Sequence, residues 1–428
     1  MSSQQRTADM LSVEEARDRI LALVPILEVE RRPLLETIGQ VLADEIIAPF
    51  DIPPMENSAM DGYAVRYEDI RGATASRPRQ LSVIGHMAAG QMSDSKVRRG
   101  TAIRIMTGAT IPSGADTVVP FEETDEKERK AAGRALDHVA VRREVTLGEA
   151  VRPRGEDVMK GDLVLPQGAV LRPSELGVLA SLGYGQVRVI RRPVIAIVAT
   201  GDELLEPGQP SSPGKIYDSN SYSVAASVVK YGGTPRLLGI ARDTMESMNK
   251  KLDEGLAADL LITSAGVSKG DYDMVKDVLA ARGEITFWSV RMRPAKPLAF
   301  GILHGLDGRK VPHLGLPGNP VSAMVAFEEL GRPALLKMLG YTRLSKPTVE
   351  AVLEDPIFNN DGRRVYARVI VSKRDDTYHA RLSGPQGSNL LTSMARANGL
   401  AICPEDVPVM RVGQRVKVRM LDWDAEQL

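Results

Sequence analysis

Five short segments carry carboxylate, hydroxyl or basic side chains, three of them together with glycine, and each of them follows an apolar run. They are residues 199–204 (ATGDEL), 241–243 (ARD), 264–273 (SAGVSKGDYD), 291–297 (RMRPAKP) and 315–322 (GLPGNPVS). Carboxylate oxygens are the ligands that Mg²⁺ prefers, whereas guanidinium and ammonium groups bind oxyanions. If the five segments meet in space, they predict a site that holds a metal ion and a phosphate together.

The segment 315–322 has the pattern of a helix start. Asn319 can cap a helix, Pro320 suits the first helical position, and Gly318 lets the backbone approach a neighbour closely. The free N–H groups of a helix N-terminus bind phosphate or carboxylate, but a well-capped helix without a ligand explains this segment alone equally well. The cations Arg293 and Lys296 of the preceding segment favour the anion site, since both suit oxyanions.

The acidic side chains of these segments have two explanations. Asp202, Glu203, Asp243, Asp271 and Asp273 bring hard oxygens to the same loops, as expected for a magnesium site. Asp271, Asp273 and Asp243 each also stand at the start of an expected helix, where a carboxylate caps the helix and compensates its dipole. For Asp271 the capping role is the better explanation.

Residues 266–270 (GVSKG) satisfy G-x-S-x-G, the pattern of a hydrolase nucleophile elbow, with Ser268 as the nucleophile. That fold needs more strands before the elbow than the two expected here, as well as a later Asp and then His. A serine hydrolase is therefore the weaker alternative. The chain contains no H-E-x-x-H pair, no Walker A loop and no G-x-G-x-x-G, so metallopeptidase chemistry and the common nucleotide loops are unsupported.

The elements around these segments follow from periodicity. Ser12 and Glu15 form a capping box that opens an amphipathic helix ending before Pro33. Between residues 51 and 143, short strand-like runs separated by Gly and Pro predict a β-rich domain, in which 125–134 (DEKERKAAGR) is expected to be a solvated loop.

After Arg192 strands and helices alternate, which predicts right-handed βαβ units and a parallel sheet. Strands are expected over 194–199, 237–240, 260–263, 285–290 and 311–316, and helices over 222–231, 245–256, 272–282 and 321–330. Ligands of such sheets bind beyond the carboxyl ends of the strands, where the five segments lie. Further strands over 366–372, 378–382 and 415–421 predict a final β-rich domain.

Composition excludes several classes of protein. The chain has 428 residues, with 55 Lys plus Arg against 55 Asp plus Glu, so no net charge draws it to nucleic acid or membrane. Aromatic residues are scarce and no apolar run reaches the roughly 18 residues of a membrane span. The single Cys403 and a start without a signal peptide favour a reducing, cytoplasmic location.

Six motifs together closely resemble the molybdopterin molybdenumtransferase family, which includes the enzymatic half of gephyrin. They are 56–65 (ENSAMDGYAV), 104–112 (RIMTGATIP), 200–204 (TGDEL), 264–273, 292–301 (MRPAKPLAFG) and 315–323 (GLPGNPVSA). The resemblance implies a transferase that inserts molybdenum from molybdate into adenylylated molybdopterin, with Mg²⁺ assisting, and releases AMP. It also implies a homodimer that works with molybdopterin adenylyltransferase and with cofactor-receiving molybdoenzymes or chaperones. A gephyrin-type scaffold that binds partner proteins is an alternative function.

The resemblance also implies a multi-domain α/β fold. A discontinuous N-terminal domain would comprise residues 1–50 and 144–176, with the β-rich domain 51–143 inserted into it. A central three-layer α/β domain with a mostly parallel sheet would span 177–340 and bind molybdopterin. A β-barrel-like C-terminal domain would span 341–428.

Carried over motif by motif, the resemblance assigns roles to individual residues. The catalytic set is Asp61, Thr107, Glu203, Asp243, Asp273, Arg293 and Lys296, with Asp243 and Asp273 as metal ligands. The substrate-binding set is Gly266, Ser268, Pro297, Gly318, Asn319, Arg368 and Ser393, of which the last two would contact molybdate. The chain departs from the family at Ala295, where a glycine is common, and at Ser289, where some members carry a lysine.

Overall fold

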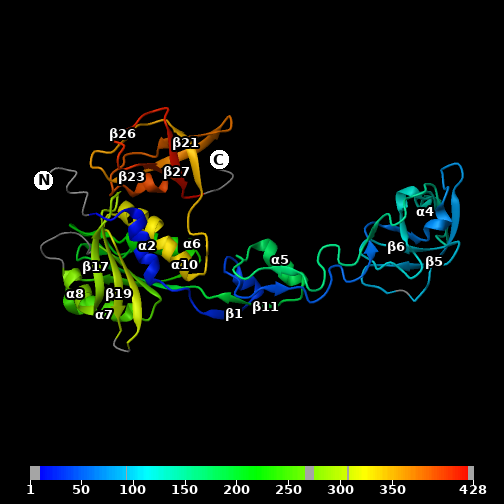
Figure 1. Cartoon of the computed structure of the whole chain (residues 1–428), viewed down its shortest axis with the longest axis horizontal. Helices are drawn as coiled ribbons and strands as arrows, with labels where there is room; N and C mark the ends of the chain where they lie inside the picture. Colours follow the sequence, from blue (N-terminus) through cyan, green and yellow to red (C-terminus); the bar gives the residue numbers. More distant parts are fainter. Residues whose placement is uncertain (1–9, 93, 266–273, 306–307, 423–428) are drawn as a thin grey trace. The chain divides into compact units, whose positions relative to one another are not determined.

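The computed structural model describes residues 10–92, 94–265, 274–305 and 308–422, without the side chains of residues 274–276 and 280. Contacts divide the chain into two units, shown in Figure 1. Unit 1 comprises residues 1–43, 168–176 and 185–428, and unit 2 comprises 44–167 and 177–184. The finer division into four domains stays a prediction.

The first helix of unit 1 is built as its capping box predicts. Helix α2 spans Val13–Leu23; the Oγ of Ser12 accepts a hydrogen bond from the Glu15 backbone N–H at 3.1 Å, and the Ser12 N–H donates to the Glu15 carboxylate at 2.8 Å. The helix buries Val13, Ala16 and Ile20 against the core. Its predicted end before Pro33 is confirmed.

Unit 1 contains a six-stranded sheet in the order β15-β12-β16-β20-β19-β17. The strands are β12 (Val194–Thr200), β15 (Thr234–Ala241), β16 (Leu260–Ser264), β17 (Gly283–Ser289), β19 (Pro297–His304) and β20 (Lys310–Leu316). The first four in the order are parallel, and β19 is antiparallel to both β20 and β17. The mostly parallel sheet is confirmed, but strand β19 was not expected, because its apolar run follows directly on the basic segment 291–297.

Helices cover both faces of this sheet, which gives three layers (Figure 1). They are α6 (Asn220–Lys230), α7 (Met245–Gly255), α8 (Met274–Arg282), α9 (Pro320–Ala326), the π-helix η3 (Phe327–Gly331) and α10 (Arg332–Met338). Ile195 and Ile197 of β12 pack with α2, α6, α9, η3 and α10, whereas Ala196 and Val198 pack with α7 and α8. Alternate side chains of one strand thus enter two cores, and the predicted three-layer class is confirmed.

The loops that were expected to meet do lie at one edge of the sheet. Strands β15, β12, β16 and β20 are parallel, so the loops after Ala241, Thr200, Ser264 and Leu316 open at the same edge. Strand β17 runs in the same direction, because it and β20 are both antiparallel to β19. The basic segment after Ser289 therefore opens at that edge too.

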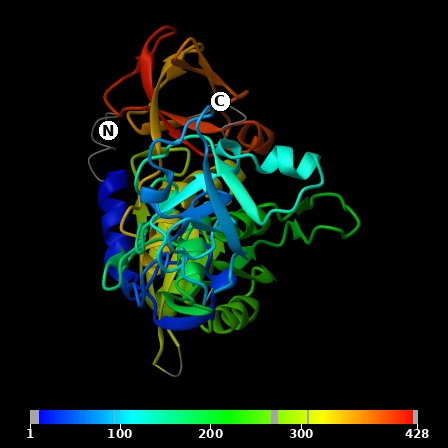
Figure 2. The same cartoon turned by 90° about the vertical axis from the view of Figure 1, so that its right-hand side faces the viewer.

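The C-terminal strands close into a barrel, the orange-to-red part of Figures 1 and 2. Its strands are β21 (Thr348–Leu353), β23 (Arg364–Arg374), β24 (Thr377–Leu382), β25 (Gly399–Cys403) and β27 (Arg415–Met420), with β23 pairing back to β25. The short strand β18 (Met292–Arg293) of the basic segment pairs with β23. The basic segment therefore joins the barrel to the three-layer part of unit 1.

Unit 2 is built on a five-stranded sheet in the order β7-β4-β6-β5-β8. Its strands are β4 (Gly62–Val65), β5 (Arg79–Met87), β6 (Thr101–Ile105), β7 (Thr117–Pro120) and β8 (His138–Val141). The β-rich character predicted for this segment is confirmed.

The expectation of a solvated loop at 125–134 is wrong. Helix α4 spans Glu126–Ala131, and the carboxylate of Glu126, only 2% exposed, accepts hydrogen bonds from Tyr63 at 2.6 Å and Arg104 at 2.8 Å. Burial alone would raise its pKa, but hydrogen bonds from Arg104, Lys130 and Tyr63 hold the pKa of Glu126 at about 2. The charged run forms a helix because one of its acids neutralises a cation of the sheet.

Short elements complete the described chain. They are β1 (Val29–Pro33), η1 (Leu34–Thr37), β2 (Ile46–Ile47), β3 (Asn57–Ser58), α3 (Tyr67–Ile70), η2 (Phe121–Glu123), β9 (Val151–Arg152), β10 (Leu163–Leu165), α5 (Pro173–Ser181), β11 (Gln186–Ile190), β13 (Leu204–Leu205), β14 (Ile216–Tyr217), β22 (Ile357–Phe358), α11 (Leu391–Ala395) and β26 (Val409–Met410). Among the described residues, no helix combines the length and apolar character that a membrane crossing requires.

Candidate functional site

Two adjoining cavities lie at the edge of the sheet where the strand-end loops meet. The basic cavity, of about 450 Å³, lies between the basic segment and the barrel. The strand-end cavity, of about 650 Å³, lies over the ends of β12, β16 and β20. Both are lined by Pro297, Asn319 and Ser322, so they are neighbouring compartments of one cleft. Their sizes are typical of small-ligand sites.

The basic cavity is lined by cations from two parts of the chain. Arg293 and Lys296 come from the basic segment, and Arg363 and Arg368 come from the barrel. Its other polar lining residues are Asn319, Ser322, Tyr366, Gln386 and Ser388. Within the part of the chain that the structure describes, no carboxylate lines this cavity, so its chemistry is that of an anion site.

Arg368 is the most deeply buried of these cations, with 1% of its surface exposed. Its Nε donates to the Oγ of Ser393 at 2.8 Å, and its Nη2 donates to the carbonyls of Pro385 and Gly387 at 2.9 and 3.1 Å. No described carboxylate pairs with it. Burial lowers the pKa of Arg368 to about 10, so the side chain stays charged at neutral pH. A buried cation without a counter-ion is costly, and an anionic ligand would supply one.

Ser393 lies behind Arg368 and not on the wall of the cavity. Its Oγ accepts from Arg368 and donates to the carbonyl of Leu390 at 2.7 Å, and 3% of the residue is exposed. Besides Ser322, the cavity is lined by Ser388 and by the neighbouring Gln386. Sequence reasoning missed both, although the stretch 384–389 (GPQGSN) between an expected strand and the Ser393 motif has the composition of a structured turn.

The structure brings the predicted pair Arg293 and Lys296 together on one wall. Arg293 donates to the carbonyl of Phe358, and its Nη1 lies 3.7 Å from a carboxylate oxygen of Asp361. Arg363 also donates to Asp361, at 3.0 Å from its Nε, so one carboxylate serves two arginines. Lys296 is exposed, and its ammonium has no partner among the described residues. Lys296 and Arg368 are therefore the cations left for a ligand.

Ala295, between these two cations, has a backbone φ of +77° and is buried. An L-residue with a side chain pays about 1–2 kcal/mol for this left-handed conformation, and glycine does not. The strained position is the one at which the related family commonly has glycine, so the departure noted in the sequence has a physical consequence.

Replacing Ala295 with glycine is expected to stabilise the protein by about 0.5–1 kcal/mol, because relief of strain exceeds the added entropy of the unfolded chain. Urea unfolding of the purified variant measures the change. Ala299→Gly in strand β19, where the backbone is extended, is the matched control and should destabilise by about 1 kcal/mol. Equal destabilisation by both variants would show that the Ala295 conformation is not strained.

Asn220 ties together the loops around the strand-end cavity. Its Nδ2 donates to the Oγ of Ser264 at 2.7 Å and to the carbonyl of Gly318 at 2.8 Å. Its Oδ1 is buried without a partner among the described residues. Asn220 lines the cavity beside Asp218, whose carboxylate accepts from the Ser221 N–H at 3.0 Å. The unpaired Oδ1 of Asn220 is available to a hydrogen-bond donor on a ligand.

Sequence reasoning missed Asp218 and Asn220. The run Asp218-Ser219-Asn220 directly before an expected helix is a capping pattern that could have marked the position. This run was not recognised as part of the site because no strand was expected immediately before it, and only strand-end loops were expected to bind a ligand.

Gly318 and Asn319 lie where the sequence predicted. A Cβ added to Gly318 would lie 3.3 Å from the Cβ of Ala265, so the loops after β16 and β20 approach closely at this glycine. Asn319 occupies the N-cap position before Pro320, but its side chain makes no capping hydrogen bond to the described backbone. Asn319 lines both cavities instead.

Of the predicted acids, Glu203 lines the strand-end cavity. Asp243 is exposed, and its N–H donates to the carboxylate of Asp202 at 3.3 Å. The cap of helix α7 is Thr244, whose Oγ1 accepts from the Ser247 N–H at 3.2 Å, so the Asp243 side chain is not the cap.

Only part of the predicted magnesium site lies within the described residues. Asp273, Gly266 and Ser268 lie outside the described residues. Among the residues that are described, no three His, Cys, Asp or Glu side chains gather into a group that could hold a metal ion. These residues therefore do not make a magnesium site by themselves.

Asp61 and Thr107, predicted from separate motifs, contact each other in unit 2. The backbone N–H and the Oγ1 of Thr107 donate to the same oxygen of Asp61, at 2.7 and 2.8 Å. These hydrogen bonds lower the pKa of Asp61, which therefore carries a charge at neutral pH. The pair forms a fixed carboxylate on this unit.

The chain is similar to known proteins over most of its length. Residues 11–183 match the family model "MoeA N-terminal region (domain I and II)", 196–337 match "Probable molybdopterin binding domain", and 350–421 match "MoeA C-terminal region (domain IV)". The chain is 37% identical over 422 residues to molybdopterin molybdenumtransferase 2 of Mycobacterium tuberculosis, covering 97% of this chain and 100% of the relative. It is 35% identical to molybdopterin molybdenumtransferase of Nostoc, covering 96% of this chain and 94% of the relative.

A crystal structure of the molybdopterin biosynthesis moeA protein from Pyrococcus horikoshii OT3 is similar in fold. The TM-score is 0.77 at 30% sequence identity, and the match covers 96% of this chain and 100% of the other. The similarity therefore extends over the full architecture and is not limited to the central sheet.

Proposed function

The chain belongs to the molybdopterin molybdenumtransferase family, the transferases of molybdenum cofactor biosynthesis, and from this premise we propose that it inserts molybdenum from molybdate into adenylylated molybdopterin and releases AMP. The observation that carries the proposal is the basic cavity with its buried, unpaired Arg368. Molybdate is a small dianion, and the guanidinium of Arg368 offers it a charge and directed N–H donors.

The two cavities divide the substrates between them. The basic cavity takes molybdate between Arg368 and Lys296, and the strand-end cavity takes the pterin beside Asn220. Pro297, Asn319 and Ser322 line both, so a pterin in one cavity places its dithiolene sulfurs next to molybdate in the other. Holding the two reactants side by side converts a bimolecular step into an effectively unimolecular one.

The chemistry is electrostatic positioning without a covalent enzyme intermediate. Water adds to the pyrophosphate as its bond to AMP breaks, so that the pterin keeps a terminal phosphate and AMP leaves as an anion, and the exposed ammonium of Lys296 stabilises the charge that develops. Arg293 is held by Phe358 and Asp361, so its planar group presents a fixed orientation to a phosphate. Neither role requires these side chains to exchange a proton.

Reconstitution with purified adenylylated molybdopterin tests the proposal. AMP release is followed with and without molybdate, and we expect release that depends on molybdate. Molybdate-independent hydrolysis, together with labelling of Ser268 by a fluorophosphonate probe, would instead identify a serine hydrolase. Among the described histidines, none lines either cavity to serve as the base that such an enzyme needs.

Mg²⁺ is part of the proposal through Asp243 and Asp273, the two carboxylates that the family resemblance assigns to it. Asp243→Asn is expected to raise the Mg²⁺ concentration for half-maximal AMP release by about tenfold or more, because a carboxylate ligand is replaced by a neutral amide. Asp375→Asn, an equal change of charge in the β23–β24 turn, is the control. An unchanged Mg²⁺ dependence in the Asp243 variant would remove Asp243 from the ligand set.

We also propose a homodimer that receives its substrate from molybdopterin adenylyltransferase and passes the cofactor to molybdoenzymes or their chaperones. The resemblance of the six motifs to the family implies this assembly and this place in the reaction sequence. Sedimentation velocity of the purified chain tests the dimer, and a monomer at micromolar concentration would contradict it.

A further inference from the structure

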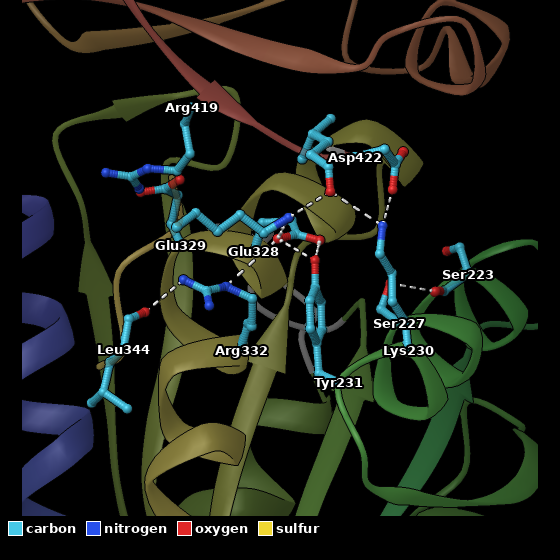
Figure 3. Close-up of polar contacts among 12 residues, drawn as sticks. Ser223, Ser227, Lys230, Tyr231, Glu328, Glu329, Arg332, Leu344, Arg419 and Asp422 are labelled. Atoms are coloured by element: carbon cyan, nitrogen blue, oxygen red, sulfur yellow. Dashed lines mark hydrogen bonds and ion pairs between the residues drawn. The ribbon is translucent and has the colours of Figure 1, made fainter. Parts of the chain in front are cut away.

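Two neighbouring glutamates are buried in the π-helix η3, between the three-layer part of unit 1 and the barrel. Glu328 is 7% exposed and Glu329 is 1% exposed. Figure 3 shows that both carboxylates point toward cations contributed by other elements. Neither glutamate lines the basic cavity or the strand-end cavity, so the sequence motifs and the proposed reaction leave them without a role.

Glu329 forms an ion pair with Arg419 of strand β27 (Figure 3). The second oxygen of Glu329 and the Nε of Arg419 are buried without a partner among the described residues. A buried ion pair with unsatisfied atoms contributes little net stability, because removing two charges from water opposes their attraction. Its best-supported use in proteins is to specify one arrangement of the elements that it joins.

Glu328 joins the same two parts of unit 1 through other residues. It accepts hydrogen bonds from the hydroxyl of Tyr231 at 2.8 Å and lies 3.0 Å from the ammonium of Lys346. Lys346 also donates to the carbonyl of Leu421 at 3.0 Å. Lys346 precedes β21 and Leu421 follows β27, so η3 holds the barrel at the ends of two adjacent strands.

The strand pairing connects this contact to the basic cavity. Arg419 of β27 lies opposite Leu400 of β25, and Leu400 lies opposite Arg368 of β23. Residues opposite one another on neighbouring strands point to the same face of a sheet, and strands are about 4.8 Å apart. Arg419 and Arg368 therefore lie in one row on one face, roughly 10 Å apart across the sheet.

The helix that carries Glu329 also reaches the cavity. Helix α9 begins directly after Asn319 and contains Ser322, both of which line the basic cavity, and it continues directly into η3. Glu329 follows Ser322 by seven positions along the helix, a rise of roughly 10 Å at 1.5 Å per residue. The stretch of helix from Ser322 to Glu329 and the row of residues from Arg368 to Arg419 are thus of similar length. At one end the ion pair of Glu329 and Arg419 joins them, and at the other end Ser322 and Arg368 line the same cavity.

We propose that Glu329 and Arg419 form a positioning pair that sets the distance between Arg368 on the barrel and the Asn319–Ser322 wall, and so determines how tightly the basic cavity holds an oxyanion. The inference rests on the proposed function for the identity of the oxyanion, molybdate. Neither residue contacts the ligand; they act through the placement of Arg368.

Single and double variants test the pair in the full-length protein. Glu329→Gln and Arg419→Gln should each weaken binding of molybdate alone, measured by equilibrium dialysis, by about tenfold, and raise the molybdate concentration for half-maximal AMP release equally. The affinity for adenylylated molybdopterin and the rate at saturating molybdate should change less than twofold. The double variant should be no worse than either single variant, because both remove one interaction.

The exposed pair Glu350 and Arg415, on strands β21 and β27 of the same barrel, is the matched control. Glu350→Gln and Arg415→Gln should leave molybdate binding unchanged. Arg419→Lys keeps the charge and should recover most of the affinity, which separates positioning from failure to fold. Molybdate affinities within twofold of the unmodified protein, even with a lowered melting temperature, would overturn the inference. Molybdate binding by the unmodified protein without AMP release would instead overturn the proposed function.

Discussion

Arg368→Ala is expected to raise the molybdate concentration for half-maximal AMP release by roughly ten- to a hundredfold, since a hydrogen bond to a charged group contributes about 1.5–3 kcal/mol. The guanidinium is buried, charged and unpaired among the described residues, so its loss removes the strongest anion-binding group of the basic cavity. Steady-state kinetics with molybdate as the varied substrate measure the effect. Binding of adenylylated molybdopterin should be retained, because its cavity is lined by other residues.

Two variants control this experiment. Arg368→Lys keeps the charge but cannot reproduce the hydrogen bonds to Ser393, Pro385 and Gly387, so its effect should be intermediate. Arg415→Ala removes one exposed positive charge from the same barrel and should have no effect. Loss of pterin binding with unchanged molybdate dependence would show that the two substrates do not occupy separate cavities.

Asn220→Ala is expected to weaken binding of adenylylated molybdopterin by at least roughly tenfold, because two buried hydrogen bonds and one free acceptor are removed at about 1 kcal/mol or more each. Its amide connects the end of β16, through Ser264, with the loop after β20, through Gly318. Without it, the loops on either side of the strand-end cavity lose a shared donor. Equilibrium binding of the adenylylated substrate measures the change.

Ser227→Ala, about two turns further along helix α6, is the control for Asn220→Ala. Its hydroxyl donates to the carbonyl of Ser223 at 2.8 Å and does not reach either cavity. This variant should bind the substrate normally. If Asn220→Ala lowers the melting temperature but binds the substrate as the unmodified protein does, Asn220 supports the loops without contacting the ligand.

Local patterns were sufficient for much of the fold. The capping box of Ser12 and Glu15, the apolar run of β12 and the Asn319-Pro320 helix start each depend on residues near one another in sequence, and all three were predicted at their observed places. Strand β19 was missed because its apolar run follows directly on the basic segment, and its antiparallel position depends on β17 and β20 on its two sides. Glu126 was assigned to a solvated loop because its partner, Arg104, lies on strand β6 and is distant in sequence.

At the candidate site, too, local features were predicted and features that depend on distant residues were missed. Arg293 and Lys296 could be recognised in the sequence, since two cations in a proline-rich loop indicate an anion site by themselves. Ser393 was predicted to contact molybdate, but its place behind Arg368 follows from the packing of helix α11 against strand β23. Asn220 was missed because its importance lies in reaching two loops that are distant in sequence.

The sequence by itself determined the family, most strands of the central sheet and the kinds of residue at the site, because motifs and hydrophobic periodicity are properties of short stretches. Only the tertiary structure decided that Arg368 faces Lys296 across one cavity, that Ser388 and not Ser393 lines it, and that Glu329 meets Arg419. These arrangements depend on the register of the barrel strands and on how the barrel packs against η3. Burial and pairing of charges are long-range properties, which short stretches of sequence do not contain.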